Sequence, residues 1–174
     1  MSARRGEPIV VRLGGPADVD AAASVFLRSN LARRRGRPIS SARLEQVTAR
    51  LRDPASWFLV AEDGRAAVGM ACAEPVRADD GAGAAIPNAC FLGYLFIVPE
   101  RWGQGIGGIV LDAVLNEARR RGYYRIELWT HADNERSHRL YRSRGFSPTG
   151  WTREDDQRGR IGQWAREIQL RSGG

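Results

Sequence analysis

Apolar and polar positions along the first third of the chain predict one strand followed by two helices. Residues 9–13 form a short apolar run, which favours a strand. Apolar side chains then recur at helical spacing over residues 17–31 and again over residues 41–52, where Asp53-Pro54 ends the second helix. The face of the first helix that we expect to be buried consists of Val19, Ala22, Ala23, Phe26 and Leu27.

The middle of the chain predicts three strands. Residues 57–62 and 66–73 are apolar runs around Asp63-Gly64, and Asp-Gly between two such runs predicts a β-hairpin with a type I′ turn. Residues 77–88 are rich in Gly, Ala and Asp and predict a loop. The most apolar strand is expected over residues 89–98.

Two helices and three strands are predicted in the C-terminal part. A long helix over residues 107–121 ends at a glycine, and a strand over residues 124–130 follows. Residues 134–144 predict a helix with an asparagine cap at its start and a glycine at its end. The last two strands are expected at residues 148–152 and 163–170.

This order of elements, together with the composition, predicts one mixed α/β domain over residues 1–174. A chain of 174 residues with 43% hydrophobic residues can form one well-buried core. No apolar run approaches the roughly 20 residues of a membrane helix. Residues 1–8 carry positive charge but no apolar segment follows, so we expect no signal peptide and a cytoplasmic location. Cys72 and Cys90 lack any CxxC pairing and are expected to be buried free thiols.

The net charge of +7 comes from 27 basic residues, all of them arginine. A basic surface suits nucleic acid or a small polyanion such as coenzyme A. The arginines are scattered apart from two clusters, residues 33–37 and 119–121, so we expect most of them to be solvated. His138 lies among arginines in the middle of a predicted helix and is also expected to be solvated.

Four glycines stand between the strand over residues 89–98 and the helix that follows. The segment reads Arg101-Trp102-Gly103-Gln104-Gly105-Ile106-Gly107-Gly108. Glycines leave the backbone bare, so its amides can point together at an anion in front of the helix dipole. The sequence therefore predicts a diphosphate site here.

Two other diphosphate loops are weighed against this segment. A nucleoside triphosphate loop needs Lys followed by Ser or Thr, whereas Ile109-Val110 follow Gly108. The dinucleotide pattern GxGxxG is formally matched from Gly103 to Gly108, and Glu127 lies about 20 residues further on. Four residues separate the strand from the first glycine, and only 66 residues follow Gly108, which is too few for a doubly wound sheet and a catalytic domain. A dinucleotide-binding oxidoreductase stays an alternative.

The glycine segment resembles the coenzyme A loop of the GNAT superfamily of N-acetyltransferases, Gln/Arg-x-x-Gly-x-Gly/Ala. Gly105 and Gly107 match, whereas Trp102 takes the Gln/Arg position and the neighbouring Arg101 would supply the charge. A second block, residues 134–146, resembles the family helix Asn-x-x-Ala/Ser-x-x-Leu-Tyr-x-x-x-Gly-Phe. The resemblance covers about residues 57–150.

The resemblance implies a fold and a cofactor site. The fold would be a mixed, mostly antiparallel twisted sheet of about six to seven strands, flanked by about four helices, with splayed central strands around the acyl-CoA. The backbone of Phe96, Ile97 and Val98 would hold the pantetheine arm and polarise the thioester. The pyrophosphate would be held by the loop, and Asn134 and Ser137 would contact the pantetheine or the adenosine. The loop residues expected in this role are Arg101, Gly103, Gln104, Gly105, Ile106, Gly107 and Gly108.

The implied chemistry is direct attack of an amine on the thioester. Tyr141 would donate a proton to the departing thiolate, since a phenol stays protonated at neutral pH. His131 is our candidate base, because imidazole titrates near neutrality, and Glu74 acting through water is another. Some relatives carry Glu five residues before the Asn, where this chain has Trp129. Trp129 would line the acceptor pocket or pack in the core.

We therefore expect acetyl-CoA as co-substrate, no metal, and a primary amine, on a small molecule, as acceptor. A protein or peptide N-acetyltransferase is the first alternative. A non-catalytic nucleic-acid binder is placed last, because no helix carries a concentrated basic face. Residues 33–37 lie between the first two helices, which often line the acceptor site in this family, so an acidic acceptor and a solvated loop both stay open. A homodimer is also left open.

Overall fold

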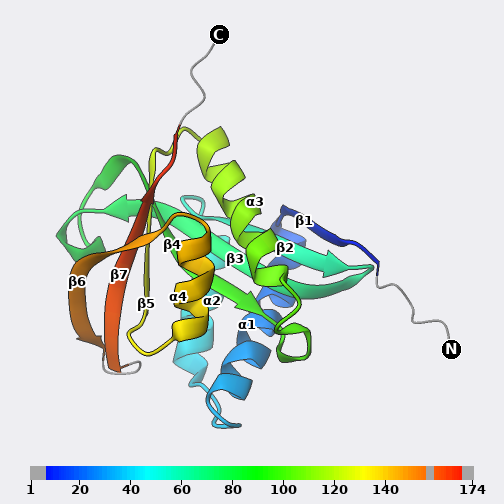
Figure 1. Cartoon of the computed structure of the whole chain (residues 1–174). Coiled ribbons are helices and arrows are strands. Elements are labelled where there is room, and N and C mark those ends of the chain that lie inside the picture. Colours follow the sequence, from blue (N-terminus) through cyan, green and yellow to red (C-terminus); the bar gives the residue numbers. More distant parts are fainter. Residues whose placement is uncertain (1–6, 156–158, 170–174) are drawn as a thin grey trace, which may run out of the picture. The chain divides into compact units, whose positions relative to one another are not determined.

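The computed structural model describes residues 7–155 and 159–169 of the chain (Figure 1). Its backbone contacts form two compact units. The first unit holds Met1–Cys72 and Tyr94–Ala113, and the second holds Ala73–Gly93 and Val114–Gly174. The chain passes between them along β3 (Ala66–Arg77), β4 (Ala85–Ile97) and α3 (Ile106–Arg120).

Within the described residues, seven strands form one sheet in the order β1-β2-β3-β4-β5-β7-β6. The β4–β5 pair is parallel, with Ala89 opposite Arg125, whereas β1–β2, β5–β7 and β6–β7 are antiparallel. None of the described helices has both the length and the apolar character that crossing a bilayer requires. The remaining elements are β1 (Ile9–Leu13), η1 (Pro16–Asp18), α1 (Val19–Arg33), α2 (Ser41–Arg52), β2 (Trp57–Asp63), η2 (Asp79–Gly81), η3 (Pro99–Arg101), β5 (Arg125–His131), α4 (Glu135–Ser143), β6 (Ser147–Asp155) and β7 (Gly159–Glu167).

The expected mixed α/β fold is confirmed, with differences at the ends of elements. The β2–β3 turn has Gly64 and Arg65 at its centre, and of the two only Gly64 has a positive φ, +62°. A type I′ turn needs positive φ at both central residues, so the prediction of that turn is wrong and the pattern is that of type II′. β4 begins at Ala85 inside the predicted loop, and Leu170, the predicted end of the last strand, lies outside the described residues.

The first unit has a core built from α1, α2 and the strands that they cover. Val25 and Phe26 of α1 and Val47 of α2 are all at most 1% exposed. Leu27 is 37% exposed, so its predicted place on the buried face is wrong. The buried stripe of α1 passes through Val25 and Phe26, and Leu27 lies a further 100° or so round the helix.

In the second unit, β5 shows the alternation of a strand that has two different faces. Ile126, Leu128 and Thr130 are buried, and the residues between them are half-buried. Cys90 of β4 pairs with Ile126, and burial raises the pKa of its thiol to about 12. Cys90 and Cys72, which lies in the first unit, are both buried and free, as predicted.

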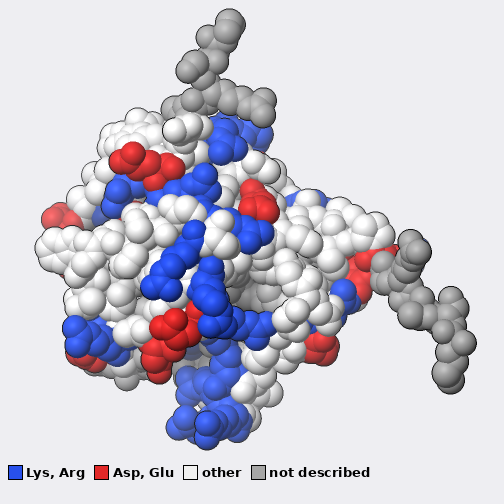
Figure 2. Space-filling model, viewed as in Figure 1, with Lys and Arg blue, Asp and Glu red and all other residues white. Residues whose placement is uncertain are grey.

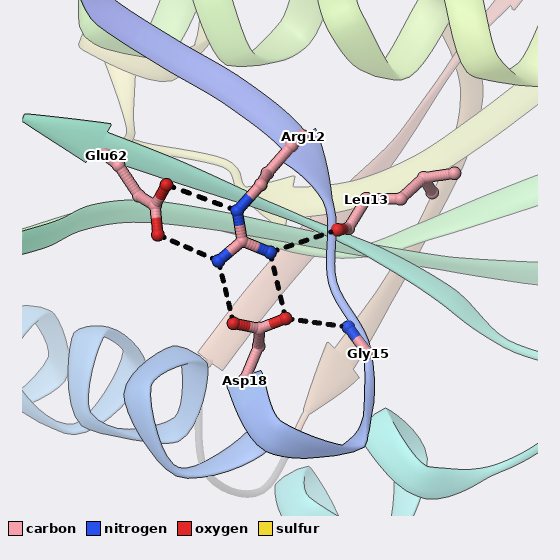
Figure 3. A network of polar contacts seen from close by, with 5 residues as sticks. All are labelled: Arg12, Leu13, Gly15, Asp18 and Glu62. Carbon is pink, nitrogen blue, oxygen red and sulfur yellow. Dashed lines mark hydrogen bonds and ion pairs between the residues drawn. The ribbon is translucent and has the colours of Figure 1, made fainter. Parts of the chain in front are cut away.

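Two carboxylates hold the guanidinium of Arg12 at the N-terminal edge of the first unit (Figure 3). Its Nη1 and Nη2 donate to Asp18 over 2.9 and 2.8 Å, and its Nε and Nη2 donate to Glu62 over 3.2 and 2.8 Å. Asp18 also accepts from the Gly15 N–H at 2.8 Å. The hydrogen bonds from Arg12, and next that from Gly15, lower the pKa of Asp18 to about 2. The cluster therefore joins β1, η1 and β2.

We predict that Asp18 stabilises the fold in a way that acid removes. Its folded pKa lies below its ordinary value of 3.8, so the stabilisation is complete above about pH 4 and is lost as the pH falls toward 2. Asp18→Asn should lower the melting temperature at pH 7 by about 2–4 °C, and the difference from wild type should shrink below pH 4. Asp20→Asn, at an exposed carboxylate two residues further on in the first turn of α1, is the control and should change little. A difference that stayed constant from pH 7 to pH 2 would contradict the prediction.

Candidate functional site

The glycine segment forms a loop between η3 and α3 in which two glycines have left-handed backbone. Gly103 has φ +76° and Gly105 has φ +79°, with the exposed Gln104 between them. A side chain at either glycine would therefore be strained. A Cβ atom built on Gly105 would meet nothing within 4 Å, so the space beside its Cα is open.

The start of α3 leaves backbone donors directed at this loop. The Ile109 N–H donates to the Gly105 carbonyl over 3.3 Å, which places Gly105 at the N-cap position. Glycine has no side chain with which to cap a helix. The N–H groups of Ile106, Gly107 and Gly108 therefore have no acceptor within the helix, and the helix dipole adds partial positive charge at the same point. Such a group of donors binds an anion.

Side chains on either side of the loop hold its shape. Arg101 forms an ion pair with Asp63 of β2 and donates from Nε to Gln104 Oε1 over 2.8 Å. Gln104 in turn donates from Nε2 to the Glu100 carbonyl over 3.3 Å. Because Asp63 already pairs with its charge, Arg101 orients the loop in this structure. A direct contact between Arg101 and a phosphate stays a prediction.

The end of β4 is tied to the same loop. Trp102, which stands where the family carries Gln or Arg, donates from its indole Nε1 to the Ile97 carbonyl over 2.7 Å. The Val98 N–H donates to the Val68 carbonyl of β3 over 2.9 Å. N–H groups alternate in direction along a strand, so the Ile97 N–H points away from β3. By the same alternation the Phe96 N–H lies on the β3 side with that of Val98, so among the three strand residues expected to bind pantetheine it is Ile97 that directs its N–H away from β3.

The second motif forms the turn from β5 into α4 in the second unit. Asn134 caps α4, because its Oδ1 accepts from the Ser137 N–H over 3.2 Å. The His131 carbonyl accepts from the Asn134 N–H at 3.2 Å and from Nε2 of His138 at 3.0 Å. A carbonyl can only accept, so Nε2 of His138 carries a hydrogen. The motif asparagine thus has a structural function as the cap.

Tyr141 and His138 form the buried face of α4. Tyr141 is 8% exposed, with ring centroids 5.7 Å from Phe146 and 6.3 Å from Trp164. His138 is 7% exposed and stacks on Trp164, with the centroids 4.9 Å apart and the planes at 28°. The prediction that His138 is solvated is wrong, since it lies one turn from Tyr141 and packs on the same strand.

A polar group on one face of β5 was not found from the sequence. Glu127 shares that half-buried face with Trp129 and His131. It accepts from Arg125 Nε over 2.8 Å and from Gln163 Nε2 of β7 over 3.4 Å. The alternation of every second residue before His131 could have placed Glu127 on the same face of the strand. That Gln163 contacts Glu127 could be identified only from the pairing register of β5 and β7. The alternative base, Glu74, is half-buried in β3.

Trp129 is half-buried, and Arg153 of β6 covers its ring, with Cζ 4.5 Å from the ring centroid. A charged side chain thus lies over one face of the indole, and both expected roles of Trp129, lining the acceptor pocket and packing in the core, stay predictions.

The expected site residues thus fall into two sets, one in each unit. The first unit brings together Phe96 to Gly108, and the second brings together His131, Asn134, Ser137 and Tyr141. Among the described residues, no group of three or more His, Cys, Asp or Glu side chains could hold a metal ion.

Comparisons with known proteins agree with the two motifs. Residues 25–146 match the model of the "Acetyltransferase (GNAT) family". The mycothiol acetyltransferase of Beutenbergia cavernae is 34% identical over 80 residues, and the chain spans only 27% of that relative's length. The ribosomal-protein-S18-alanine N-acetyltransferase of Escherichia coli has a similar fold, with TM-score 0.74 and 16% identity over 95% of this chain and 97% of that chain.

A further solved structure, YncA from Salmonella typhimurium with its cofactor acetyl-CoA, gives TM-score 0.73 and 21% identity over 97% of this chain and 98% of that chain. These structural similarities show that the fold is shared. The family model covers well over half of the chain and includes both the glycine loop and the Asn134–Tyr141 motif. On these grounds the chain belongs to the GNAT family of acetyltransferases.

Proposed function

We propose that this protein transfers an acetyl group from acetyl-CoA to a primary amine of a small molecule. The observation that carries the proposal is the start of α3, where three backbone N–H groups without a helical acceptor follow a glycine N-cap. A diphosphate satisfies such donors, and coenzyme A carries one. The relative whose structure holds acetyl-CoA supports this choice of anion.

In the proposed complex, each loop feature has one function. The amides from Gln104 to Gly108, with Gly103 and Ile106 among them, hold the pyrophosphate, and Arg101 keeps the loop in shape through Asp63 and Gln104. Ile97 supplies the backbone contact to pantetheine, with Phe96 next to it in the strand. The Ile97 N–H, which points away from β3, donates to the thioester carbonyl and stabilises the oxyanion as it forms.

The proposed reaction is direct attack in a ternary complex. The amine nitrogen bonds to the thioester carbon while the C–S bond breaks, and the nitrogen loses one proton. His131 accepts that proton, and the Tyr141 hydroxyl donates one to the departing thiolate. Glu127 lies on the same face of β5 as His131 and is a second candidate base, because it too is half-buried and accepts hydrogen bonds. Asn134 and Ser137 contribute the α4 end of the cofactor contact.

A small acceptor is favoured over a peptide, although the relatives include both kinds. One similar fold belongs to an enzyme named for a ribosomal protein, and one relative is named for mycothiol. Trp129, with Arg153 over its ring, replaces the carboxylate that peptide-acetylating relatives carry. Family membership supports an acetyltransferase over the dinucleotide-binding and nucleic-acid-binding alternatives. One acetyltransferase domain over residues 1–174 and a cytoplasmic location stay predictions.

The direct test is a coenzyme A release assay with acetyl-CoA and a panel of amines, amino acids, aminoglycosides and peptides. We expect transfer to at least one small amine and weaker transfer to the peptides. Failure to bind acetyl-CoA at millimolar concentration would reject the proposal, and transfer confined to peptides would reject the acceptor class.

We predict that Gly105→Val prevents coenzyme A binding. A branched side chain would occupy the open space beside the loop, so the affinity measured by calorimetry should fall more than tenfold, which is a loss of more than about 1.4 kcal/mol. Gly150→Val is the matched control, because Gly150 also has positive φ, +95°, and nothing within 4 Å of its Cβ position. Equal affinity in the two variants would contradict the role of the loop.

We predict that Tyr141→Phe lowers the turnover number about a hundredfold while acetyl-CoA affinity stays nearly unchanged. Phenylalanine keeps the packing against Phe146 and Trp164 and removes only the hydroxyl. Tyr124→Phe, at a tyrosine that is 45% exposed, serves as the control and should match wild type. Wild-type turnover in Tyr141→Phe would exclude the hydroxyl as the proton donor.

We predict that His131→Ala flattens the acidic limb of the pH–rate profile, because protonated imidazole cannot accept a proton from the amine. The measurement is kcat/KM against pH with a saturating cofactor. His138→Asn changes the other of the two histidines, and its pH–rate profile should keep the acidic limb. An unchanged limb in His131→Ala, together with its loss in Glu127→Gln, would identify Glu127 as the base.

A further inference from the structure

The net charge of the protein is concentrated in one segment of the first unit. Residues 28–52 contain eight arginines and one acidic residue, Glu45, which is a net +7 and equals the net charge of the whole chain. The other 19 arginines and 19 acidic residues cancel. Figure 2 shows a mass of basic side chains at the lower end of the view, where Figure 1 places the connection between α1 and α2. The expectation of scattered arginines thus misses this concentration.

Beneath this segment, three aromatic rings form a cluster. Phe26 of α1 lies edge-on to Tyr94 and Phe96 of β4, with centroids 5.6 and 5.1 Å away, and the centroids of Tyr94 and Phe96 are 6.3 Å apart. Phe26 and Tyr94 are buried, at 1% and 4% exposure. The cluster is therefore part of the core of the first unit, and one of its rings belongs to the strand end that we assign to the acyl carrier.

One arginine lies over each ring of the cluster. Arg33 from the end of α1 lies over Phe96, with Cζ 6.0 Å from the ring centroid. Arg43 and Arg50 of α2 lie over Phe26 and Tyr94, at 5.9 and 5.1 Å. Arg43 and Arg50 are seven residues apart, which puts them on the same face of α2. We call Arg33, Arg43 and Arg50 the ring-capping arginines.

A guanidinium has five N–H donors in its own plane, and contact with a π-face uses none of them, so an arginine over a ring can hold other partners at the same time. Arg43 does so, because its Nη1 also donates to Gln46 Oε1 over 3.4 Å. Such forks match the two oxygens of a carboxylate or phosphate. The excess of arginines over carboxylates in residues 28–52, from which the Arg28–Glu100 ion pair subtracts one charge, further favours an anion over a neutral or cationic ligand.

We propose that the ring-capping arginines bind an oxyanion, carboxylate or phosphate, on the acceptor amine. The proposal rests on the function proposed above and narrows its acceptor to amines that also carry a negative group. The position of the anion follows from Phe96, because this residue contributes its ring to the cluster and directly precedes Ile97, whose N–H we assign to the thioester. An amine anchored through its anion beside Phe96 therefore lies near the acyl carrier.

The test compares acceptors that differ only in the anion. β-Alanine is paired with β-alaninamide, and O-phosphoethanolamine with ethanolamine, in the acetyl-CoA assay. The charged member of at least one pair should have a kcat/KM at least tenfold higher, and which pair responds distinguishes carboxylate from phosphate. Equal rates within both pairs would overturn the proposal and leave the acetyltransferase function intact. If acetyl-CoA neither binds nor is consumed, the function itself fails.

Variants locate the effect. Arg43→Gln and Arg50→Gln should each reduce the charged-to-neutral ratio of kcat/KM about tenfold, because each removes a charge-assisted contact. Arg52→Gln removes the same charge from the same helix at an exposed position and should change the ratio less than twofold. Equal losses in all three variants would overturn the proposal in favour of a general field effect.

A binding readout separates anchoring from folding. Calorimetry with O-phosphoethanolamine in the presence of coenzyme A should show the same order of affinities as the kinetics. Coenzyme A affinity should be unchanged in Arg43→Gln and Arg50→Gln. A variant that loses affinity for both O-phosphoethanolamine and coenzyme A would have a structural defect. In that case Arg43→Lys, which keeps the positive charge but not the planar guanidinium, is the variant whose charged-to-neutral ratio tests the proposal. Full rescue of the ratio by lysine would overturn bidentate recognition.

Discussion

The N-terminus of α3 has backbone donors with no acceptor within the helix, and this is the constraint on which the candidate site depends. Gly105 takes the cap position and cannot cap with a side chain. Two left-handed glycines allow the chain to turn into the helix here. Arg101, Gln104 and Trp102 then tie the loop to Asp63, Glu100 and Ile97, so the donors are held in place before any ligand arrives.

The motif of the second unit has a structural function beside the catalytic one that we propose for it. Asn134 caps α4, and the His131 carbonyl accepts hydrogen bonds from both the cap residue and His138. His138 and Tyr141 pack against Trp164 on one face of the helix. A residue type that a family motif requires can therefore be explained by the fold as well as by catalysis, and only substitutions that keep the packing separate the two.

The charged residues are distributed unevenly between the α1–α2 segment and the rest of the chain. Elsewhere arginines lie beside carboxylates, so that charges largely offset each other locally. Arg101 pairs with Asp63, Arg12 with both Asp18 and Glu62, and Glu117 with both Arg120 and Arg121. The α1–α2 segment, residues 28–52, has one carboxylate for eight arginines, and one of these, Arg28, pairs outside the segment with Glu100. Three of those arginines lie over buried rings, which makes a concentrated positive charge compatible with a packed core.

The sequence by itself determined the order of elements, the mixed α/β class, the glycine loop and the asparagine cap, because periodicity, caps and turns depend on residues close together in the chain. Only the tertiary structure decided that His138 is buried, that Leu27 is exposed, that Asp63 pairs with Arg101 and that Gln163 reaches Glu127. The last two contacts join residues 38 and 36 positions apart. Such contacts depend on strand register and on which helix covers which strand, and these are set by packing of the whole core rather than by local pattern.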